Sequence, residues 1–422
     1  MPNVIDSVVS LLKGSHSCFH AVAKMEEKLK ENGFVRFSES EPFVLTKGGR
    51  YYVTRNDSSI IAFILPEWPS LGFRLVATHN DSPTFALKPN PILNRNGVAS
   101  LNVEPYGGAL YYPWLDRALS FAGRVYYETD DGIRNCLIDV DEDLLVIPSL
   151  AIHMNREANK GKEFNAAKDM IPLWSSDEIQ GDFAQYLQNK AGIAGKVLSF
   201  DLFLYVREEP RFVGENKELL LSPRLDDLSS AYSSLLAFLS IQEKEQGYIP
   251  VFVSFDNEEV GSLTRQGANG DFLASTLRRI LVSLGYGEEE QRMAFSNSIL
   301  LSTDNAHANH PNHPEVSDPT THVRLNGGVV LKYNADQKYT TNAESAAYVK
   351  KLCLDLGDPY QEFTNRSDLR GGSTLGNISN SQVSLLSADI GIAQLAMHSC
   401  VEVCGAKDIE RMVRLLESHY RQ

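Results

Sequence analysis

The stretch Val251-Phe-Val-Ser-Phe-Asp-Asn-Glu-Glu-Val-Gly261 joins a strand-like run to a cluster of carboxylates. Its apolar part, Ile249–Phe255, is short, rich in β-branched and aromatic residues and preceded by Gly247, which is typical of a buried strand. Open α/β sheets bind ligands beyond the carboxyl ends of their strands, so Glu258 and Glu259 are expected to face such a crevice. One carboxylate there can bind a metal while its neighbour takes a proton from water. A loop with two solvated acids is the alternative, and the rest of the chain decides between the two.

Three further hydrophobic runs stop at a residue that can bind a metal, and a fourth such residue opens an expected helix. Two of the runs end at His79 and Asp304, the strand-like run Ile390–Met397 is followed by His398, and the helix begins at Asp226. One such coincidence would be weak, but four together predict a site at one edge of a sheet.

The predicted donors are imidazoles and carboxylates, without a thiolate. This combination suits zinc, with manganese or cobalt as substitutes. Two histidines and several carboxylates are enough for two ions that share a bridging carboxylate, lie about 3.5 to 4 Å apart and activate a water. Asp81 follows His79 on the same side of its strand, so its carboxylate is expected to accept the second N–H of that imidazole.

Composition describes a globular protein of two or three domains. The chain has 422 residues, 43% hydrophobic and 22% charged, which excludes disordered and fibrous classes. No apolar run approaches the about 18 to 20 residues that span a bilayer, and the run Val8–Leu12 is too short for a secretory signal. Five scattered cysteines fit a reducing compartment, so we expect a cytoplasmic protein. The formal charge of -14 argues against a nucleic-acid partner.

The pattern of expected secondary structure changes twice along the chain. Residues 1–88 and 214–422 alternate strand-like and helix-like segments, which predicts a sheet containing parallel strands and covered by helices on both faces. Residues 89–213 hold short alternating apolar runs broken by turn signals, so this block is expected to be β-rich. We therefore predict one α/β domain that carries an inserted β-rich domain.

The segment Ala306–Pro314 contains three more histidines, at 307, 310 and 313. Its two prolines favour an irregular loop over a metal-binding tract, particularly because Asp304 already stands at the strand end. Contact with a substrate stays open for His307 and His310.

Five motifs, in this order along the chain, resemble the aspartyl aminopeptidase family of dinuclear zinc exopeptidases: Thr78-His-Asn-Asp-Ser-Pro83, Ser222-Pro-Arg-Leu-Asp-Asp227, Asp256-Asn-Glu-Glu-Val-Gly261, Ser302-Thr-Asp-Asn-Ala-His-Ala308 and Leu395-Ala-Met-His-Ser399. The resemblance covers essentially the whole chain. It implies a zinc exopeptidase-like α/β domain with an inserted dimerisation domain, dimers that assemble into a dodecamer, and two zinc ions per subunit.

The resemblance also implies a role for each motif residue. The zinc ligands would be His79, Asp226, Glu259, Asp304 and His398. Asp226 would bridge the two ions, although many relatives have Asn where this chain has Asp227. Glu258 would be the general base.

Two further residues would contact the substrate. His153, in Ala151-Ile-His153, resembles the family residue that reaches into the neighbouring subunit's site, so activity would require assembly. From the residues alone, a structural histidine on an apolar strand is the alternative. Lys332 resembles the residue that holds an acidic substrate side chain, and a solvated lysine is the alternative. The net charge of -14 does not attract acidic peptides, so the preference stays open.

The leading prediction is a metal-dependent aminopeptidase that releases N-terminal Asp or Glu from peptides with a free N-terminus, through a water activated by two zinc ions. The alternatives are a relative that prefers neutral residues, a hydrolase of other amides such as N-acyl amino acids, and a non-catalytic assembly protein. The last is disfavoured because neither Glu258 nor any predicted ligand is missing.

Overall fold

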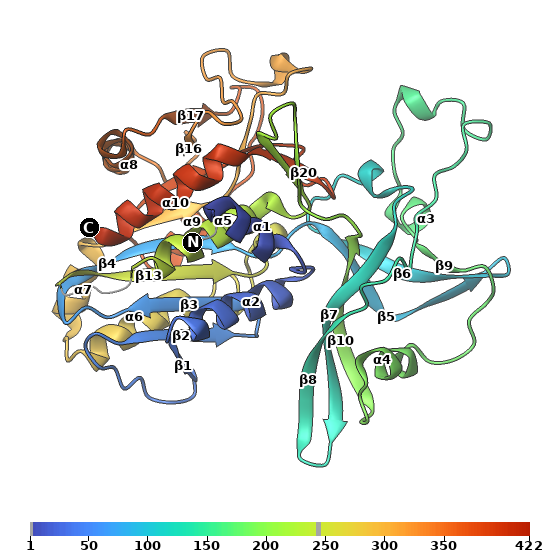
Figure 1. Ribbon diagram of the computed structural model, residues 1–422, viewed down its shortest axis with the longest axis horizontal. Coiled ribbons are helices and arrows are strands. Elements are labelled where there is room, and N and C mark those ends of the chain that lie inside the picture. Colours follow the sequence, from blue (N-terminus) through green and yellow to red (C-terminus); the bar gives the residue numbers. More distant parts are fainter. Residues whose placement is uncertain (1–2, 242–245) are drawn as a thin grey trace. The chain divides into compact units, whose positions relative to one another are not determined.

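The chain forms two compact units in this computed structural model, which describes residues 3–241 and 246–422 (Figure 1). The first unit comprises residues 1–81, 210–397 and 402–422, and the second comprises residues 82–209 and 398–401. Residues 1–2 and 242–245, which fall in the predicted α/β domain, lie outside the described residues. The second unit overlaps most of residues 89–213, where the sequence predicts the inserted domain. The role of that domain in dimerisation stays a prediction.

A nine-stranded mixed sheet forms the centre of the first unit. Its strands, in spatial order, are β1 (Val35–Phe37), β2 (Arg50–Arg55), β3 (Ser59–Ile64), β13 (Gln246–Phe255), β4 (Trp68–His79), β14 (Ile299–Thr303), β18 (Leu386–Gly391), β16 (Val329–Tyr333) and β17 (Tyr360–Thr364). The four central strands β13, β4, β14 and β18 run parallel, whereas β3 and β16 pair antiparallel to them. Parallel strands bury both faces, which explains their nearly continuous apolar sequences.

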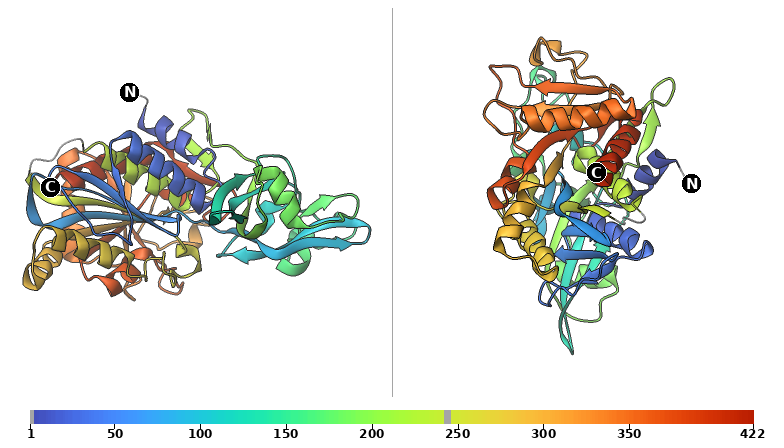
Figure 2. Two further views of the ribbon diagram at one scale, coloured as in Figure 1. Left: turned by 90° about the horizontal axis from the view of Figure 1, so that it is seen from below. Right: turned by 90° about the vertical axis from the view of Figure 1, so that its left-hand side faces the viewer.

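Helices cover both faces of this sheet, as predicted (Figure 2). One core packs under α1 (Val4–Leu12), α2 (Cys18–Glu31), α5 (Leu225–Leu239), α8 (Ala343–Leu356) and α10 (Ala406–Arg421). The opposite core packs under α6 (Phe272–Ser283), α7 (Glu288–Ser296) and α9 (Leu375–Gln382). Among the described residues, no helix is long and apolar enough to cross a membrane.

The prediction of one strand across Ile390–Met397 is wrong. β18 ends at Gly391, and the next residues form β19 (Ala393–Leu395) in a separate five-stranded sheet. That sheet has the order β11 (Arg211–Val213), β12 (Leu219–Ser222), β20 (Glu402–Gly405), β19 and β15 (Ala306–His307). An apolar run alone cannot show that its two halves pair with different neighbours.

The second unit is built on a six-stranded antiparallel sheet. Its strands, in spatial order, are β8 (Gly132–Asp139), β7 (Leu119–Thr129), β10 (Val197–Val206), β5 (Thr84–Arg95), β6 (Val98–Tyr106) and β9 (Leu173–Ser175). Two short helices, α3 (Ala166–Asp169) and α4 (Phe183–Ala191), accompany it. This unit has its own apolar core.

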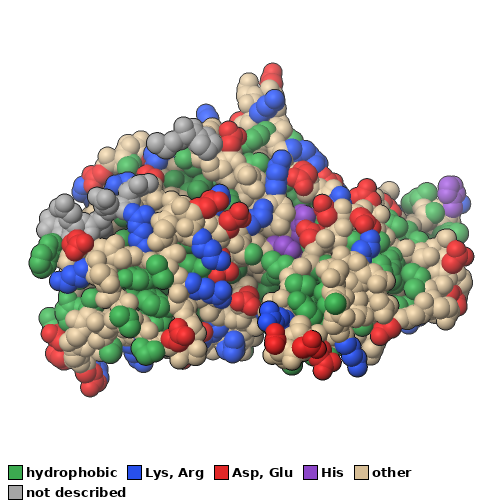
Figure 3. Space-filling model, turned by 60° about the horizontal axis from the view of Figure 1, so that its bottom comes forward, with side chains coloured by type: hydrophobic (Ala, Val, Ile, Leu, Met, Phe, Trp, Pro, Cys, Tyr) green, Lys and Arg blue, Asp and Glu red, His purple; other side chains and the backbone are tan. Residues whose placement is uncertain are grey.

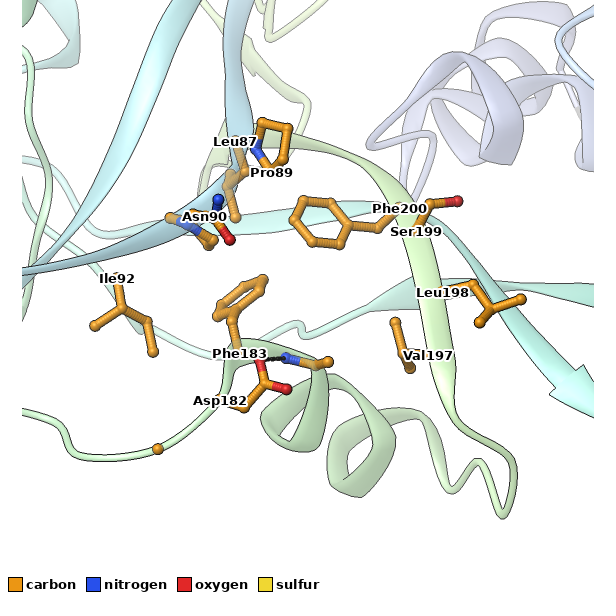
Figure 4. Close-up of a pocket in the computed structure, with 13 residues that line it drawn as sticks. Leu87, Pro89, Asn90, Ile92, Asp182, Phe183, Val197, Leu198, Ser199 and Phe200 are labelled. Carbon is orange, nitrogen blue, oxygen red and sulfur yellow. Dashed lines mark hydrogen bonds between the residues drawn. The ribbon is translucent and has the colours of Figure 1, made fainter.

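A cavity of about 340 Å³ opens on the second unit beside β5, β10 and the start of α4 (Figure 4). Apolar side chains, including Leu87, Phe183 and Phe200, supply much of its lining. Asp182 caps α4 there, because its Oδ1 accepts the Ala184 N–H at 3.0 Å. None of the predicted site residues lines this cavity.

Charged side chains of both signs are scattered over the surface seen in Figure 3, between uncharged and hydrophobic groups. Acidic and basic groups are interspersed there, so on that face the net charge of -14 is not gathered into one patch.

Candidate metal centre

Three parallel strands deliver predicted ligands to one edge of the nine-stranded sheet. His79 is the last residue of β4 and pairs in register with Phe255, the last residue of β13. The short 3-10 helix η3 (Glu258–Val260) follows β13, and Asp304 directly follows β14. The carboxyl ends of parallel strands meet at the same edge, which brings these side chains together.

Asp226 lies close to His79 and Asp304 but follows a strand of the five-stranded sheet. It follows β12 and stands at the start of α5, where the backbone of Asp226 and Asp227 is not yet helical. His79 Nε2 lies 3.4 Å from Asp226 Oδ1 and 4.0 Å from Asp304 Oδ1. Donor atoms of these three buried residues all lie within 4.8 Å of one another.

Glu258 and Glu259 complete the cluster in the first unit. One donor atom from each lies within 4.8 Å of the other and of a His79 ring nitrogen, and both side chains are half-buried. The structure therefore brings together four of the five predicted ligands and the predicted base. The ligand roles themselves stay predictions.

His398, the fifth predicted ligand, is grouped with the second unit. It is half-buried, its φ is +66°, and its Nδ1 lies 3.1 Å from the carbonyl oxygen of Gly108. The ring is thus oriented by a backbone carbonyl, as metal-ligating histidines commonly are.

Asp81 holds three parts of the cluster at once. Its Oδ1 lies 3.3 Å from His79 Nδ1 and accepts the Glu258 N–H at 3.1 Å, while its Oδ2 accepts the Glu259 N–H at 3.1 Å. His79 Nδ1 also lies 3.1 Å from the backbone carbonyl oxygen of Asp81, so acceptance of its N–H by the Asp81 carboxylate stays a prediction. The hydrogen bonds from the backbone of η3 to Asp81 could not be predicted, because sequence spacing says nothing about contacts across 177 residues.

Residues in the left-handed backbone conformation flank the two glutamates and set the direction of the chain there. Asn257 has φ +61° and Gly261 has φ +96°, so they bracket η3. Asn is among the few residues that adopt this conformation readily. Its Oδ1 accepts hydrogen bonds from Thr264 Oγ1 and Gln266 Nε2, both at 2.8 Å, which fixes the turn.

Asp226 and Asp227 face different partners. Asp226 Oδ1 approaches the His79 ring, whereas Asp227 Oδ2 accepts the backbone N–H of His79 at 3.3 Å. Of the two, only Asp226 occurs in the groups of metal-competent residues found in the described ranges. The doubled acid of the sequence thus has two distinct contacts.

Burial makes negative charge costly throughout this cluster. It raises the pKa of Glu258 to about 8, and it also raises the pKa values of Asp227, Glu259 and Asp304. Burial lowers the pKa of His79, but hydrogen bonds to Asp226 and Asp81 and the charges of neighbouring carboxylates together outweigh burial and hold that pKa well above its usual value. Crowded, buried carboxylates around an imidazole form a donor set that fits a zinc ion.

Lys332 is buried beside Asp304, with an exposed fraction of 2%. Its Nζ donates to the carbonyl oxygens of Asp304 at 2.7 Å and Asn305 at 3.2 Å, and lies 3.6 Å from Asp304 Oδ2. Burial lowers the pKa of Lys332, but the charges of Asp304 and of the other acidic groups around it together outweigh burial, and the pKa is raised. The alternative of a solvated lysine is therefore wrong, and a role in substrate binding stays a prediction.

The other predicted contact residues lie in exposed or irregular segments. His307 is exposed, with its ring centroid 6.0 Å from that of Phe363, and His310 Nδ1 accepts the Asn312 N–H at 3.2 Å. Neither histidine belongs to a metal-competent group within the described residues. His153 lies exposed in a turn, so the alternative of an apolar strand is wrong.

Gly391 lets the chain pass directly behind Asp304. A Cβ at this position would lie 2.2 Å from the Asp304 carbonyl oxygen, which is backbone and cannot move aside cheaply. We expect Gly391→Ala to lower the free energy of unfolding by about 1–3 kcal/mol and to weaken metal binding. Denaturant unfolding and zinc titration measure both, with Gly372→Ala as the control because nothing lies within 4 Å of that position. Wild-type values for both quantities would contradict this role of Gly391.

The first unit has an α/β fold with a mixed sheet, and imidazole and carboxylate donors cluster at the carboxyl ends of its central strands. This combination defines a metal-dependent α/β enzyme. Comparison with known families makes the assignment specific. Residues 11–420 match the aminopeptidase I zinc metalloprotease family (M18), and the chain belongs to this family. It is therefore a zinc aminopeptidase, a peptide hydrolase, and the resemblance to aspartyl aminopeptidases is consistent with M18.

Similar proteins match along almost the whole chain. A probable M18 family aminopeptidase 2 of Stutzerimonas stutzeri is 41% identical over 422 residues, which cover 98% of this chain and 97% of that protein. Among solved structures, a chain in the "Cryo-EM structure of the Ape4 and Nbr1 complex" is 34% identical, with a TM-score of 0.95 over 99% of this chain and 85% of that chain. The S. cerevesiae mApe1 dodecamer is 27% identical, with a TM-score of 0.86 over 100% and 97%.

Proposed function

We propose that this protein is a two-zinc aminopeptidase that prefers acidic N-terminal residues. The observation that supports a metal centre is the convergence of His79, Asp226 and Asp304 within 4.8 Å, with Glu258 and Glu259 beside His79. Glu259 and His398 would complete the ligand set, as the sequence predicts. Zinc ions bound there would polarise the scissile carbonyl and lower the pKa of a water.

Glu258 would carry the proton in this reaction. Burial raises its pKa to about 8 without a metal, and nearby positive charge lowers such a pKa again. A carboxylate tuned toward neutrality can accept a proton and return it to the leaving amine. Asp81 holds the backbone of Glu258, so the carboxylate meets the substrate from a fixed direction.

Lys332 supports the preference for acidic substrates. A substrate carboxylate needs a fixed cation, and Lys332 is a buried ammonium next to Asp304. Two backbone carbonyls accept from its Nζ, and an ammonium carries three N–H donors.

Hydrolysis of Asp-, Glu-, Leu- and Ala-anilides tests the function and its preference together. We expect release that favours Asp and Glu, stops with a chelator and returns with zinc, and fails when the amine is acetylated. Lys332→Met should lower the ratio of Asp to Leu release about 10- to 100-fold, since one charge-assisted hydrogen bond is lost. The ratio is the readout because a displaced Asp304 would lower both rates.

Each opposite result removes a different part of the proposal. Release that favours Leu would keep the metal mechanism and discard the acidic preference. Cleavage of the acetylated substrate would instead point to a hydrolase of N-acyl amino acids.

Self-association is part of the proposal. A similar structure, S. cerevesiae mApe1, is a dodecamer, and we propose dimers that assemble further for this chain. Apolar side chains are exposed around His153, namely Leu150, Ile152 and Met154, and they suit a subunit contact. A cytoplasmic location also stays part of the proposal, and none of the five cysteines, all of which lie in the described ranges, forms a disulfide, which suits a reducing compartment.

A further inference from the structure

A buried chain of polar side chains lies behind the proposed metal ligands. Glu402 on β20 accepts the Asp226 N–H through Oε2 at 2.9 Å, and Gln394 on β19 donates to Glu402 Oε1 at 3.4 Å. Gln394 Oε1 in turn accepts from Asn305 Nδ2 at 2.8 Å. Asn305, Gln394 and Glu402 are each no more than 3% exposed.

This polar chain closes around Asp226. Asn305 Nδ2 also donates to the Leu225 carbonyl oxygen at 2.8 Å, while Glu402 takes the N–H of Asp226 itself. The Leu225 carbonyl is thus bonded directly to Asn305, the residue that follows Asp304, and the Asp226 N–H is connected to Asn305 through Glu402 and Gln394. Hydrogen bonds thus connect the backbone beside Asp226 with the backbone beside Asp304, the two carboxylates that are proposed to bind one ion.

Helix α5 is adapted to this arrangement. Ser229 and Ser230 are fully buried, and Ser230 Oγ donates to Asn305 Oδ1 at 2.9 Å. Ser229 Oγ lies 2.9 Å from Asn305 Nδ2 and donates to the Leu225 carbonyl oxygen at 2.7 Å. A buried amide costs free energy unless its donors and acceptors are satisfied, and these serines satisfy it.

The bridging position of Gln394 suits an amide in particular. It donates on one side, to a carboxylate, and accepts on the other, from an amide, without adding charge to a site that is already crowded with acids. A carboxylate there would face Glu402, and an ammonium could not accept from Asn305.

We propose that Gln394, acting through Glu402 and Asn305, is a positioning residue that sets the Asp226 carboxylate relative to Asp304 and thereby determines zinc affinity. The proposal rests on the proposed metal centre. It predicts that a substitution about two hydrogen bonds away from any ligand lowers zinc affinity more than it lowers the stability of the fold. Residues that hydrogen-bond to metal ligands typically contribute about 10- to 100-fold in affinity.

The test compares Gln394→Met, which keeps the side-chain length and removes both hydrogen bonds, with Gln394→Asn, which keeps the amide and withdraws it by one methylene. Ser233→Ala is the matched control, because Ser233 is buried on α5 and its Oγ bonds to the Ser229 carbonyl of its own helix. Zinc affinity is measured by competition with a chromophoric chelator, ligand geometry by the visible spectrum of the cobalt-loaded protein, and folding by thermal melting of the metal-free protein.

We expect a 10- to 100-fold weaker zinc affinity and an altered cobalt spectrum in both Gln394 variants, with Ser233→Ala like the wild type. If Gln394→Met does not fold, Gln394→Asn decides. Wild-type zinc affinity and spectrum in a folded Gln394 variant would overturn the proposal. Absence of tight zinc binding by the wild type would instead overturn the proposed metal centre itself.

Discussion

Glu258→Gln is expected to lower kcat for release of an N-terminal residue by about 10²- to 10⁴-fold while leaving zinc content unchanged. Gln has nearly the same shape, and Asp81 would still accept the backbone N–H of residue 258. The amide cannot take a proton from water, so the loss falls on proton transfer. Steady-state kinetics on an Asp-anilide and metal analysis of the same sample measure the two quantities.

Glu259→Gln is the matched control for this experiment. The two glutamates are adjacent, half-buried and held by the same Asp81 carboxylate. If Glu259 is a ligand, its variant should lose zinc as well as activity. Near-full activity of Glu258→Gln with zinc bound would rule out Glu258 as the base, and loss of zinc from that variant would exchange the two roles.

Asp226→Asn is expected to weaken zinc binding by more than about a hundredfold and to abolish activity at ordinary zinc concentrations. Removing a ligand should exceed the about 10- to 100-fold effect of changing a residue behind a ligand. An amide supplies a neutral, weaker donor in place of a carboxylate that approaches His79 Nε2 at 3.4 Å. Equilibrium dialysis against buffered zinc, followed by the anilide assay, measures both losses.

Asp227→Asn provides the comparison. Asp227 Oδ2 accepts the His79 N–H, and an amide oxygen can accept the same hydrogen bond. Burial already raises the pKa of Asp227, so a neutral side chain is tolerated there better than a charged one. This variant should keep zinc and activity. The reverse pattern, with Asp227→Asn losing zinc and Asp226→Asn keeping it, would move the bridging role to Asp227.

The convergence of most of the candidate metal-binding residues could be predicted because these residues lie at strand ends. His79, Asp304 and the Glu258–Glu259 pair each follow an apolar run, and parallel strands carry such residues to a common edge. The prediction of a single strand before His398 was wrong, because the two halves of that apolar run belong to different sheets. Both the helices on each face of the main sheet and the β-rich block followed from periodicity.

The sequence by itself determined the donor types, the order of the motifs and the strands that carry most of them, since these are local properties of short segments. Only the tertiary structure decided that Asp226 approaches the His79 ring while Asp227 accepts the His79 backbone N–H, that Asp81 accepts two backbone N–H groups of η3, and that Lys332 is buried. It also revealed Gln394 between Asn305 and Glu402. These contacts join residues that are far apart in the chain, and their geometry follows from how sheets and helices pack, which no local pattern specifies.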